Sequence, residues 1–316
     1  MKNAIIISGP TATGKTQTAI NTYHLLKQNG LKSIIINYDS LLFYKNLDIG
    51  TAKPSDKELK KTPHEMINIS EIDTPINASI YEKKTKDVLA KYDDEVIPIF
   101  VGGSAFYIRA LIKGMYETEE VSNEIKLKSE ELFKTRGISA FIEILKDNDP
   151  QSYETLHEND HYRIIRAVEF FWQSGKPISL EKQKESDPYN FNINQWDNLN
   201  FLHIYLDLPR DEHYKFILKR TATMLDSGLI DEVEKLLKVY SGKEKPLQSI
   251  GYKEVQGYLE GSFSSIEELS ERISISTRQL AKAQRTFYKK IRPKTSFHPI
   301  QDKQKILDTI LTFLNK

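Results

Sequence analysis

Short apolar runs alternate with longer amphipathic stretches in the first third of the chain. Residues 4–8, 33–37 and 96–101 are mostly apolar and rich in isoleucine and valine, which predicts buried strands. Between the first two runs, residues 15–29 predict a helix that ends at Gly30. Because apolar strands separated by helices are typical of parallel sheets covered on both faces, the pattern predicts an α/β fold. Ligands of such sheets lie beyond the carboxyl ends of the strands.

The periodicity changes between residues 117 and 200. Apolar side chains recur there at helical spacing, for example Ile125, Leu132 and Phe141, and a further helix is predicted over residues 161–173. Residues 182–200 are polar, and strand character returns at residues 201–207. We therefore predict an α/β core formed by residues 1–116 and 201–316, with C-terminal helices, and a helical insertion domain at residues 117–200.

The composition excludes several classes of protein. Charged residues make up 28% and hydrophobic residues 39% of the chain, which excludes a disordered protein. The absence of cysteine excludes a disulfide scaffold, a cysteine-ligated zinc module and a thiol nucleophile. No apolar stretch approaches the ~20 residues of a membrane span, so we expect a cytoplasmic protein without membrane contact. Because the net charge is only +1, any affinity for nucleic acid must come from local patches.

A phosphate-binding motif follows the first predicted strand. Its pattern, G-x-x-x-x-G-K-[ST], is formed by Gly9, Pro10, Thr11, Ala12, Thr13, Gly14, Lys15 and Thr16. Backbone N–H groups of such a loop converge on a phosphate at the positive end of a helix. Lys15 would neutralise the outer phosphate, and the Thr16 hydroxyl would complete a Mg²⁺ shell. A chance turn is the competing explanation, but the preceding strand and the following helix favour a P-loop NTPase-like core, without naming the ligand.

Two further strand ends carry candidate chemistry. Asp39 follows the second predicted strand, where its carboxylate would face the phosphate loop as a general base or a magnesium ligand. A turn-forming aspartate that caps the next segment explains this position equally well. After the third strand, Gly102 and Gly103 permit a close backbone approach and Ser104 offers a hydroxyl, although an ordinary strand-to-helix turn would also contain such residues.

The predicted insertion contains two motifs with competing interpretations. His157 and His161 satisfy the H-E-x-x-H pattern of zinc proteases, which requires both histidines on one continuous helix. Asp160 instead has the character of a cap for a helix that begins at His161, which argues against zinc. On that helix Arg163 and Arg166 share one face, either as solvated charges or as a phosphate-binding pair.

A strongly basic stretch lies near the end of the chain. Residues 272–294 contain eight lysines and arginines and no acidic residue. Helical spacing places five of them on one face, namely Arg278, Lys282, Arg285, Lys289 and Arg292. Solvated helix faces usually mix both signs of charge, so this unmixed face favours binding of RNA or DNA over a chance arrangement.

Several multi-residue motifs of this chain occur together in one known family. They are residues 9–16, 39–44, 47–54, 101–104, 159–169, 174–179, 249–254 and 277–282. The most specific are Gly-Thr-Ala-Lys-Pro at residues 50–54 and Ile-Gly-Tyr-Lys-Glu at residues 250–254. With these motifs the chain resembles the tRNA dimethylallyltransferase family, the bacterial tRNA isopentenyltransferases, from the phosphate loop to about residue 290.

The resemblance implies a reaction and a role for each motif. Members attach a dimethylallyl group from dimethylallyl diphosphate to N6 of the adenine just 3′ of the anticodon of tRNA. The phosphate loop would hold the diphosphate, Asp39 would accept the N6 proton, and Lys15, Thr16 and Ser104 would complete the catalytic site. The implied tRNA contacts are Asp39, Ser40, Leu41, Leu42, Ser104, Lys126, Arg163, Arg166, Gly251, Tyr252, Lys253, Arg278, Lys282 and Arg285. Mg²⁺, the anticodon stem-loop as partner and a monomeric protein complete the expectation.

The chain departs from the family pattern at several positions. Phe216 stands where many members have arginine, with Arg220 one turn later, and Lys126 also stands where several members have arginine. Glu158 replaces a common proline, and position 104 is serine where bacterial members usually have threonine. These departures concern individual contacts with donor and tRNA.

Three other functions compete with this interpretation. An adenylate isopentenyltransferase, which prenylates AMP-type nucleotides, would suit Gly102, Gly103 and Ser104 but would not need the basic helix. A small-molecule kinase would use the phosphate loop for ATP and would leave residues 50–54 unexplained. A non-catalytic RNA-binding protein would leave the phosphate loop without a purpose.

Overall fold

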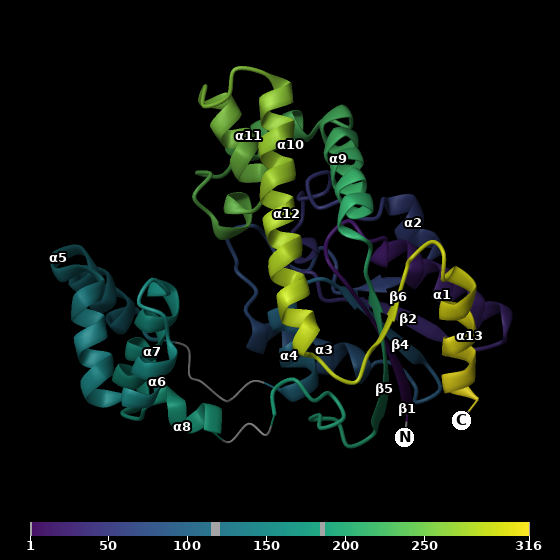
Figure 1. Ribbon diagram of the computed structural model, residues 1–316, viewed down its shortest axis with the longest axis horizontal. Coiled ribbons are helices and arrows are strands. Elements are labelled where there is room, and N and C mark those ends of the chain that lie inside the picture. The colour runs from purple at the N-terminus through teal and green to yellow at the C-terminus, as the bar shows by residue number, and fades with distance from the viewer. Residues whose placement is uncertain (1, 115–120, 184–186, 316) are drawn as a thin grey trace. The chain divides into compact units, whose positions relative to one another are not determined.

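The structure is a computed structural model of the chain, and it describes residues 2–114, 121–183 and 187–315. The chain forms two compact units (Figure 1). The core unit consists of Met1–Gly114 and Tyr189–Lys316, and the insertion unit is Met115–Pro188. The predicted boundary between residues 116 and 117 lies outside the described residues. The predicted return to the core at residue 201 differs from the observed return at Tyr189.

Aromatic anchors explain why residues 189–198 already belong to the core unit. The ring of Phe191 stacks on His203 with centroids 5.7 Å apart. The indole N–H of Trp196 donates to the carbonyl oxygen of Leu111 at 2.6 Å. The backbone N–H of Gln195 donates to the carbonyl oxygen of Ile112 at 2.9 Å. The polar composition of this stretch predicts a connection, but a few buried rings are enough to fix it to the core unit.

A six-stranded parallel sheet forms the centre of the core unit within the described residues. The strand order is β3-β2-β4-β1-β5-β6, and every neighbouring pair is parallel. The strands are β1 (Lys2–Ser8), β2 (Ser33–Asn37), β3 (His64–Glu65), β4 (Ile97–Gly102), β5 (Leu199–Leu206) and β6 (Thr295–Phe297). The predicted α/β fold with a parallel sheet is confirmed. The short edge strands β3 and β6 leave no periodic pattern in the sequence, so they were not predicted.

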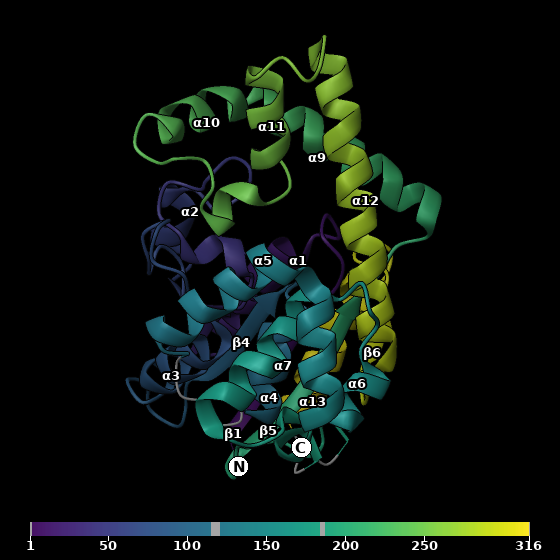
Figure 2. The same cartoon turned by 90° about the vertical axis from the view of Figure 1, so that its left-hand side faces the viewer.

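The helices of the core unit cover both faces of this sheet and extend beyond its carboxyl edge (Figures 1 and 2). They are α1 (Lys15–Gln28), α2 (Asp56–Lys61), α3 (Ala78–Leu89), α4 (Ala105–Lys113), α9 (Arg210–Asp226), α10 (Leu229–Leu237), α11 (Tyr252–Leu259), α12 (Ile266–Lys290) and α13 (Lys303–Leu314), with 3₁₀ turns at Ser40–Phe43 (η1) and Lys245–Gln248 (η2). On one face, α1 and α13 bury Leu26 and Ile306. On the other face, α3, α4 and α12 contribute Tyr81, Leu111 and Tyr288 to a larger apolar core. None of the helices in the described part of the chain is both long and apolar enough to cross a membrane.

The carboxyl ends of β2, β4 and β1 lie side by side, because these strands are parallel neighbours. Gly9 follows β1, Asp39 lies shortly after β2, and Gly103 follows β4. Helices α10 and α11 lie beyond this edge in both ribbon views, and α12 runs from the edge alongside them (Figures 1 and 2). The fold thereby gathers residues from separate motifs at one edge of the sheet.

The described residues of the insertion unit are helical. Its helices are α5 (Asn123–Asn148), α6 (Pro150–Thr155), α7 (His161–Ser174) and α8 (Ile178–Gln183). Phe141 and Leu145 of α5 pack with Ile164 and Val168 of α7 in a separate apolar core. The predicted helix cap is confirmed, because the Asp160 carboxylate accepts the N–H of the third residue of α7.

The two histidines of the H-E-x-x-H pattern do not share a helix. His161 is the first residue of α7, whereas His157 precedes the cap. Within the described ranges, the structure contains no cluster of at least three His, Cys, Asp or Glu side chains suited to a metal ion. The pattern therefore reflects a loop followed by a capped helix.

Candidate active site

The phosphate-binding motif forms a tight loop between β1 and α1. Gly9 has a φ of 153°, and a Cβ atom at this residue would lie 2.4 Å from the carbonyl oxygen of Leu206, so only glycine fits. Gly14, with a φ of 76°, is the N-cap of α1 and offers no side chain that would occupy the free N–H groups of the first turn. The start of α1 therefore remains open to an anion.

Lys15 is a buried cation at the centre of this loop. Its Nζ donates to the carbonyl oxygen of Pro10 at 2.7 Å, and the Thr13 hydroxyl donates to the same oxygen at 2.8 Å. Burial lowers the pKa of Lys15 to about 8, opposed by the charge of Asp39 and assisted by that of Arg220. A phosphate placed here would favour the charged form of Lys15.

Asp39 lies at the end of β2 and is held by its neighbours. Its backbone N–H donates to Asn37 Oδ1 at 2.8 Å, and Asn37 Nδ2 donates to the Asp39 carbonyl oxygen at 3.0 Å. The carboxylate accepts the N–H of Leu41 at 3.4 Å and caps η1. It also lies close enough to Lys15 and Arg220 to influence the pKa of both. Asp39 therefore caps η1 and also lies near two cations.

Ser40, which follows Asp39, meets Ser104 from the end of the neighbouring strand β4. The Ser40 N–H donates to Ser104 Oγ at 3.1 Å, and the two hydroxyls lie 3.4 Å apart. Gly102 allows this approach, because a Cβ atom there would lie 2.8 Å from the backbone nitrogen of Asp39. A Cβ atom at Gly103 would lie 3.4 Å from Lys15 Nζ. The structure thus brings together the predicted residues of the phosphate loop, Asp39, Ser40 and Ser104.

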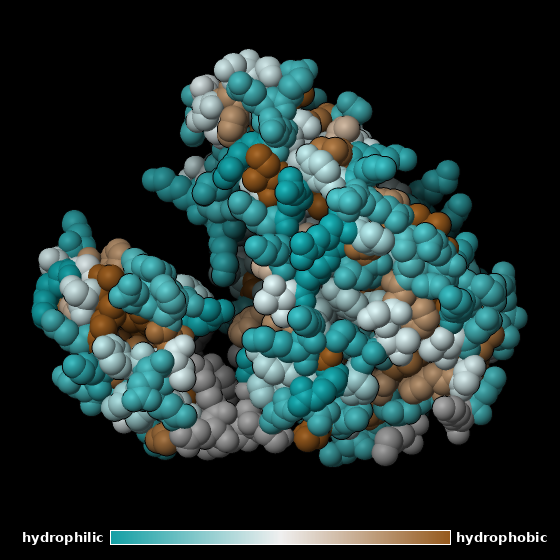
Figure 3. Space-filling view, viewed as in Figure 1, coloured by the Kyte–Doolittle hydropathy of each residue, from teal (hydrophilic) through white to brown (hydrophobic). Residues whose placement is uncertain are grey.

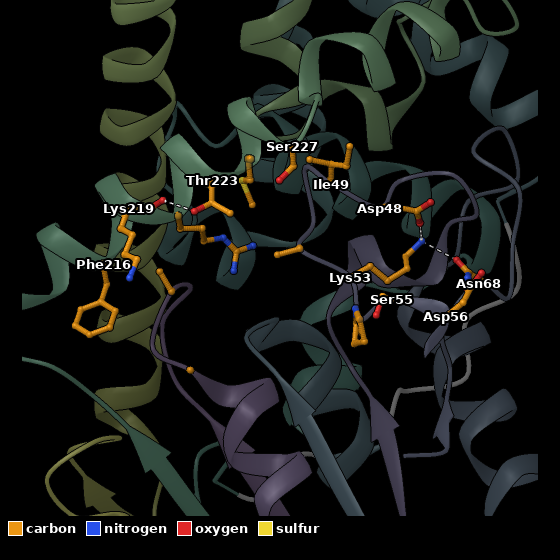
Figure 4. Close-up of a pocket in the computed structure, with 16 residues that line it drawn as sticks. Asp48, Ile49, Lys53, Ser55, Asp56, Asn68, Phe216, Lys219, Thr223 and Ser227 are labelled. Carbon is orange, nitrogen blue, oxygen red and sulfur yellow. Dashed lines mark hydrogen bonds and ion pairs between the residues drawn. The ribbon is translucent and has the colours of Figure 1, made fainter. Parts of the chain in front are cut away.

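A cavity of about 730 Å³ opens beside the phosphate loop (Figure 4). Phe216, Lys219 and Thr223 of α9 form one side, and Asp48 and Lys53 lie on the opposite side. Its apolar lining consists of Ala12, Ile49, Ala52, Pro54, Phe216 and Met224, and its cationic lining of Lys53, Lys219 and Arg220. Such a cavity suits a ligand with one anionic end and one apolar end.

The far wall of the cavity is a loop fixed by one carboxylate. Glu232 of α10 accepts the backbone N–H groups of Asp48, Ile49 and Gly50 at 3.3, 2.8 and 3.3 Å. The hydroxyl of Tyr252 donates to the same carboxylate at 2.6 Å. A Cβ atom at Gly50 would lie 2.6 Å from the Tyr252 ring, so glycine is required for this packing. Glu232 therefore determines where residues 48–50 stand against the ligand space.

Lys53 and Arg220 fix the rest of this wall. Lys53 Nζ donates to the carbonyl oxygen of Tyr44 at 2.8 Å, to Asp48 Oδ1 at 2.7 Å and to Asn68 Oδ1 at 2.6 Å. Arg220 Nη2 donates to the carbonyl oxygen of Thr51 at 3.0 Å. Burial lowers the pKa of Arg220, opposed by the Asp39 charge. Three residues of the Gly-Thr-Ala-Lys-Pro motif, Ala52, Lys53 and Pro54, thus form part of the cavity wall.

The predicted basic face of α12 is only partly exposed. Arg278, Lys282 and Lys289 are exposed, and the guanidinium of Arg278 lies 4.8 Å above the Tyr214 ring. Arg285 instead points at Asp207, with its Nε 2.8 Å from Oδ1. The helix ends at Lys290, so the prediction that Arg292 continues this face was wrong. The surface along α12 is mostly hydrophilic (Figure 3).

The other residues implied as tRNA contacts lie in different surroundings. Leu41 and Leu42 are half-buried in η1, and Gly251 is the N-cap of α11. Tyr252 is completely buried, whereas Lys253 is exposed. In the insertion unit, Lys126 is exposed, Arg163 pairs with Asp160, and Arg166 Nη1 lies 2.7 Å from Glu169.

Several residues that hold this site together were not among the predicted site residues. They include Lys53, His213, Arg220, Glu232 and Gln284. Glu232 has the sequence signature of an ordinary acidic residue in the first turn of a helix, and His213 that of a buried helical side chain. Arg220 was noted one turn after Phe216, which was the only signal for its role.

A family model described as IPP transferase matches residues 42–291. A tRNA dimethylallyltransferase of Gloeothece citriformis is 37% identical over 285 residues, which cover 90% of this chain and 88% of the relative. The chain belongs to the IPP transferase family. A tRNA dimethylallyltransferase of Caldanaerobacter subterraneus subsp. tengcongensis is 36% identical over 295 residues, which cover 90% and 88% of the two chains. The resemblance found in the sequence is thus confirmed, and the protein is a prenyltransferase.

Solved structures of related enzymes share the fold. A tRNA isopentenylpyrophosphate transferase of Staphylococcus epidermidis superposes with a TM-score of 0.67 at 30% identity and covers 100% of this chain and 99% of the other. A eukaryotic dimethylallyltransferase acting on tRNA gives a TM-score of 0.81 at 22% identity, covers 100% and 80% of the two chains, and supports the fold alone.

Proposed function

We propose that the protein transfers the dimethylallyl group of dimethylallyl diphosphate to N6 of the adenine just 3′ of the anticodon of a tRNA and releases pyrophosphate. One observation carries the proposal: the phosphate loop, whose buried Lys15 feels the charge of Asp39, contributes Ala12 and Gly14 to a cavity with cationic and apolar walls. The names of its relatives, tRNA dimethylallyltransferases, support the same reaction.

The reaction requires stabilisation of the leaving pyrophosphate and removal of a proton from the attacking N6 amine. The N6 lone pair forms a bond to the allylic carbon, the bond from that carbon to the diphosphate oxygen breaks, and pyrophosphate leaves with the electron pair. The N6 lone pair is delocalised into the ring, so departure of pyrophosphate must be strongly favoured. Lys15, Arg220 and the N–H groups of the phosphate loop would stabilise the leaving charge. Asp39 would accept the proton that N6 loses.

We propose that Mg²⁺ acts at this site as a partner of the diphosphate. The chain would supply mainly the Thr16 hydroxyl at the start of α1, and the donor's phosphate oxygens and water would supply the other ligands, an arrangement that Mg²⁺ prefers. The bound ion would neutralise charge on the departing pyrophosphate. Removal of divalent ions by EDTA should abolish transfer, and added Mg²⁺ should restore it.

We propose that RNA approaches the same edge of the sheet. The target adenine must leave its base stack so that its N6 amine reaches the bound prenyl donor. The residues that would border this adenine are Asp39, Ser40, Leu41, Leu42 and Ser104. Further contacts with the anticodon stem-loop would come from exposed cations, namely Lys126, Arg163, Arg166, Lys253, Arg278 and Lys282. All the residues proposed to bind the prenyl donor belong to one chain, so we propose that the protein acts as a monomer. We also propose that it acts in the cytoplasm.

A competition between two acceptors tests the proposal. Dimethylallyl diphosphate and Mg²⁺ are incubated with equal concentrations of an anticodon stem-loop and AMP, and both acceptors are analysed by mass spectrometry. We expect one dimethylallyl group on the RNA and none on AMP. Preferential prenylation of AMP would instead identify an adenylate isopentenyltransferase, and phosphorylation of an acceptor by added ATP would identify a kinase.

A further inference from the structure

Arg285 lies on α12 among residues that sequence spacing assigns to RNA, yet its contacts lead to the phosphate loop. We propose that Arg285 and His213 form a positioning relay that, together with Gln284, holds Thr11 of the phosphate loop in the geometry that binds the donor's diphosphate. This inference rests on the proposed function and extends it by assigning Arg285 to the donor site.

The Arg285 guanidinium makes three hydrogen bonds within the core unit. Its Nε donates to Asp207 Oδ1 at 2.8 Å, and its Nη2 donates to the carbonyl oxygen of Leu208 at 3.0 Å and to His213 Nδ1 at 2.7 Å. Its side chain is 24% exposed. A guanidinium with planar donors can serve all of these acceptors, whereas a lysine ammonium cannot reproduce the fork.

His213 connects Arg285 to the phosphate loop through two hydrogen bonds. Arginine has no acceptor, so Nδ1 of His213 must accept the bond from Arg285 and Nε2 must carry the proton. Nε2 therefore donates to the carbonyl oxygen of Thr11 at 2.7 Å. The residue is 1% exposed, and burial lowers its pKa, which keeps the ring neutral in this relay.

Gln284 holds the other side of the same residue. Its Oε1 accepts the backbone N–H of Thr11 at 2.8 Å, and its Nε2 donates to the carbonyl oxygen of Gly103 at 3.0 Å. Thr11 is thus fixed through both its N–H and its C=O by side chains of α9 and α12. Ala12, which follows Thr11, has a φ of 60°, a conformation that needs support from its surroundings.

The consequence concerns the donor and not the RNA. The loop N–H groups bind phosphate only while they point at a common centre. Loss of the bonds to the Thr11 carbonyl oxygen would let the loop relax, which weakens diphosphate binding. Lys282 provides the matched comparison, because it is also a cation of α12 but is exposed.

The test measures binding of inorganic pyrophosphate with Mg²⁺ by calorimetry, without RNA. Arg285→Ala and His213→Leu each remove hydrogen bonds from the relay, and we expect the dissociation constant to rise about tenfold. His213→Gln retains an acceptor for Arg285 and a donor for Thr11, so it should restore most of the affinity. Lys282→Ala should bind pyrophosphate as the wild type does.

The remaining outcomes separate the two proposals. Misfolded protein lowers the calorimetric stoichiometry and leaves the dissociation constant of the folded fraction unchanged, so a folding defect is recognised. Unchanged pyrophosphate affinity in Arg285→Ala, combined with a raised KM for the stem-loop like that of Lys282→Ala, would overturn the relay and assign Arg285 to RNA. Failure of the wild type to bind pyrophosphate would overturn the donor site itself.

Discussion

The polar residues of α12 differ in exposure and in hydrogen bonding between the outer and the inner side of the helix. On the outer side, Lys282 and Lys289 are exposed. On the inner side, Gln284 and Arg285 are bonded to Thr11 and to the residues that support it. A cation that already pairs with a carboxylate gains little from a phosphate of RNA, whereas an exposed lysine releases counterions when it binds one. Helical spacing assigns residues to a face, but their partners decide what they do.

The largest expected effect comes from loss of the proposed general base, which acts on the N6 amine of the acceptor. Asp39→Asn keeps an oxygen that can cap η1 but removes the general base, so turnover should fall by ~10²–10⁴-fold. The affinity for the stem-loop, measured by filter binding, should change little. Normal turnover with weak RNA binding would transfer Asp39 from catalysis to recognition.

Removal of the buried cation should have the next largest effect. Lys15→Ala deletes a preorganised positive charge at the leaving group, and we expect kcat/KM for the donor to fall by ~10²–10³-fold. Steady-state kinetics at low concentrations of dimethylallyl diphosphate provide the measurement. Near wild-type activity under these conditions would contradict the assigned role.

The lowered pKa of Lys15 adds a pH dependence to this prediction. Lys15 is charged below about pH 8 in the donor-free protein, so pyrophosphate affinity should decrease as the pH rises through that value. The ionisation of pyrophosphate itself cancels when the wild type is compared with Lys15→Ala. Identical pH profiles of the two proteins would show that Lys15 does not titrate in this range.

The outer side of α12 should respond in a different measurement. Replacing Lys282 and Lys289 by alanine removes two phosphate partners, so the plot of log affinity for the stem-loop against log salt should flatten by about one to two units. The KM for the stem-loop should rise, while turnover at saturating RNA should stay near the wild-type value. A wild-type salt slope would show that this side is only solvated.

The smallest expected effect concerns the wall of the cavity. Tyr252→Phe removes one of the donors to the Glu232 carboxylate, and the free energy of unfolding should fall by about 1–3 kcal/mol. The KM for the donor should rise only a few-fold, because the three backbone N–H groups continue to bind Glu232. Urea denaturation and donor kinetics measure both quantities, and unchanged stability would show that the bond from Tyr252 contributes nothing.

The sequence predicts best those features that depend on neighbours along the chain. The phosphate loop, the strand before it and the capping position of Asp39 are local, and the parallel sheet follows from apolar runs separated by helices. The contacts of Arg285 with Asp207 and His213 join segments far apart in sequence, so charge periodicity alone assigned Arg285 to the outer face. Tyr252 shows the same limit, because a specific motif does not reveal that its ring is buried against Gly50.

Analysis of the modified nucleoside tests the central claim most directly. An anticodon stem-loop is treated with isotope-labelled dimethylallyl diphosphate and Mg²⁺, digested completely, and compared with the same RNA in which inosine replaces the adenine 3′ of the anticodon. The account predicts that all label resides in N6-dimethylallyladenosine and that the inosine RNA, which lacks the N6 amine, remains unlabelled. Label in the inosine RNA, or on any other nucleoside, would contradict it.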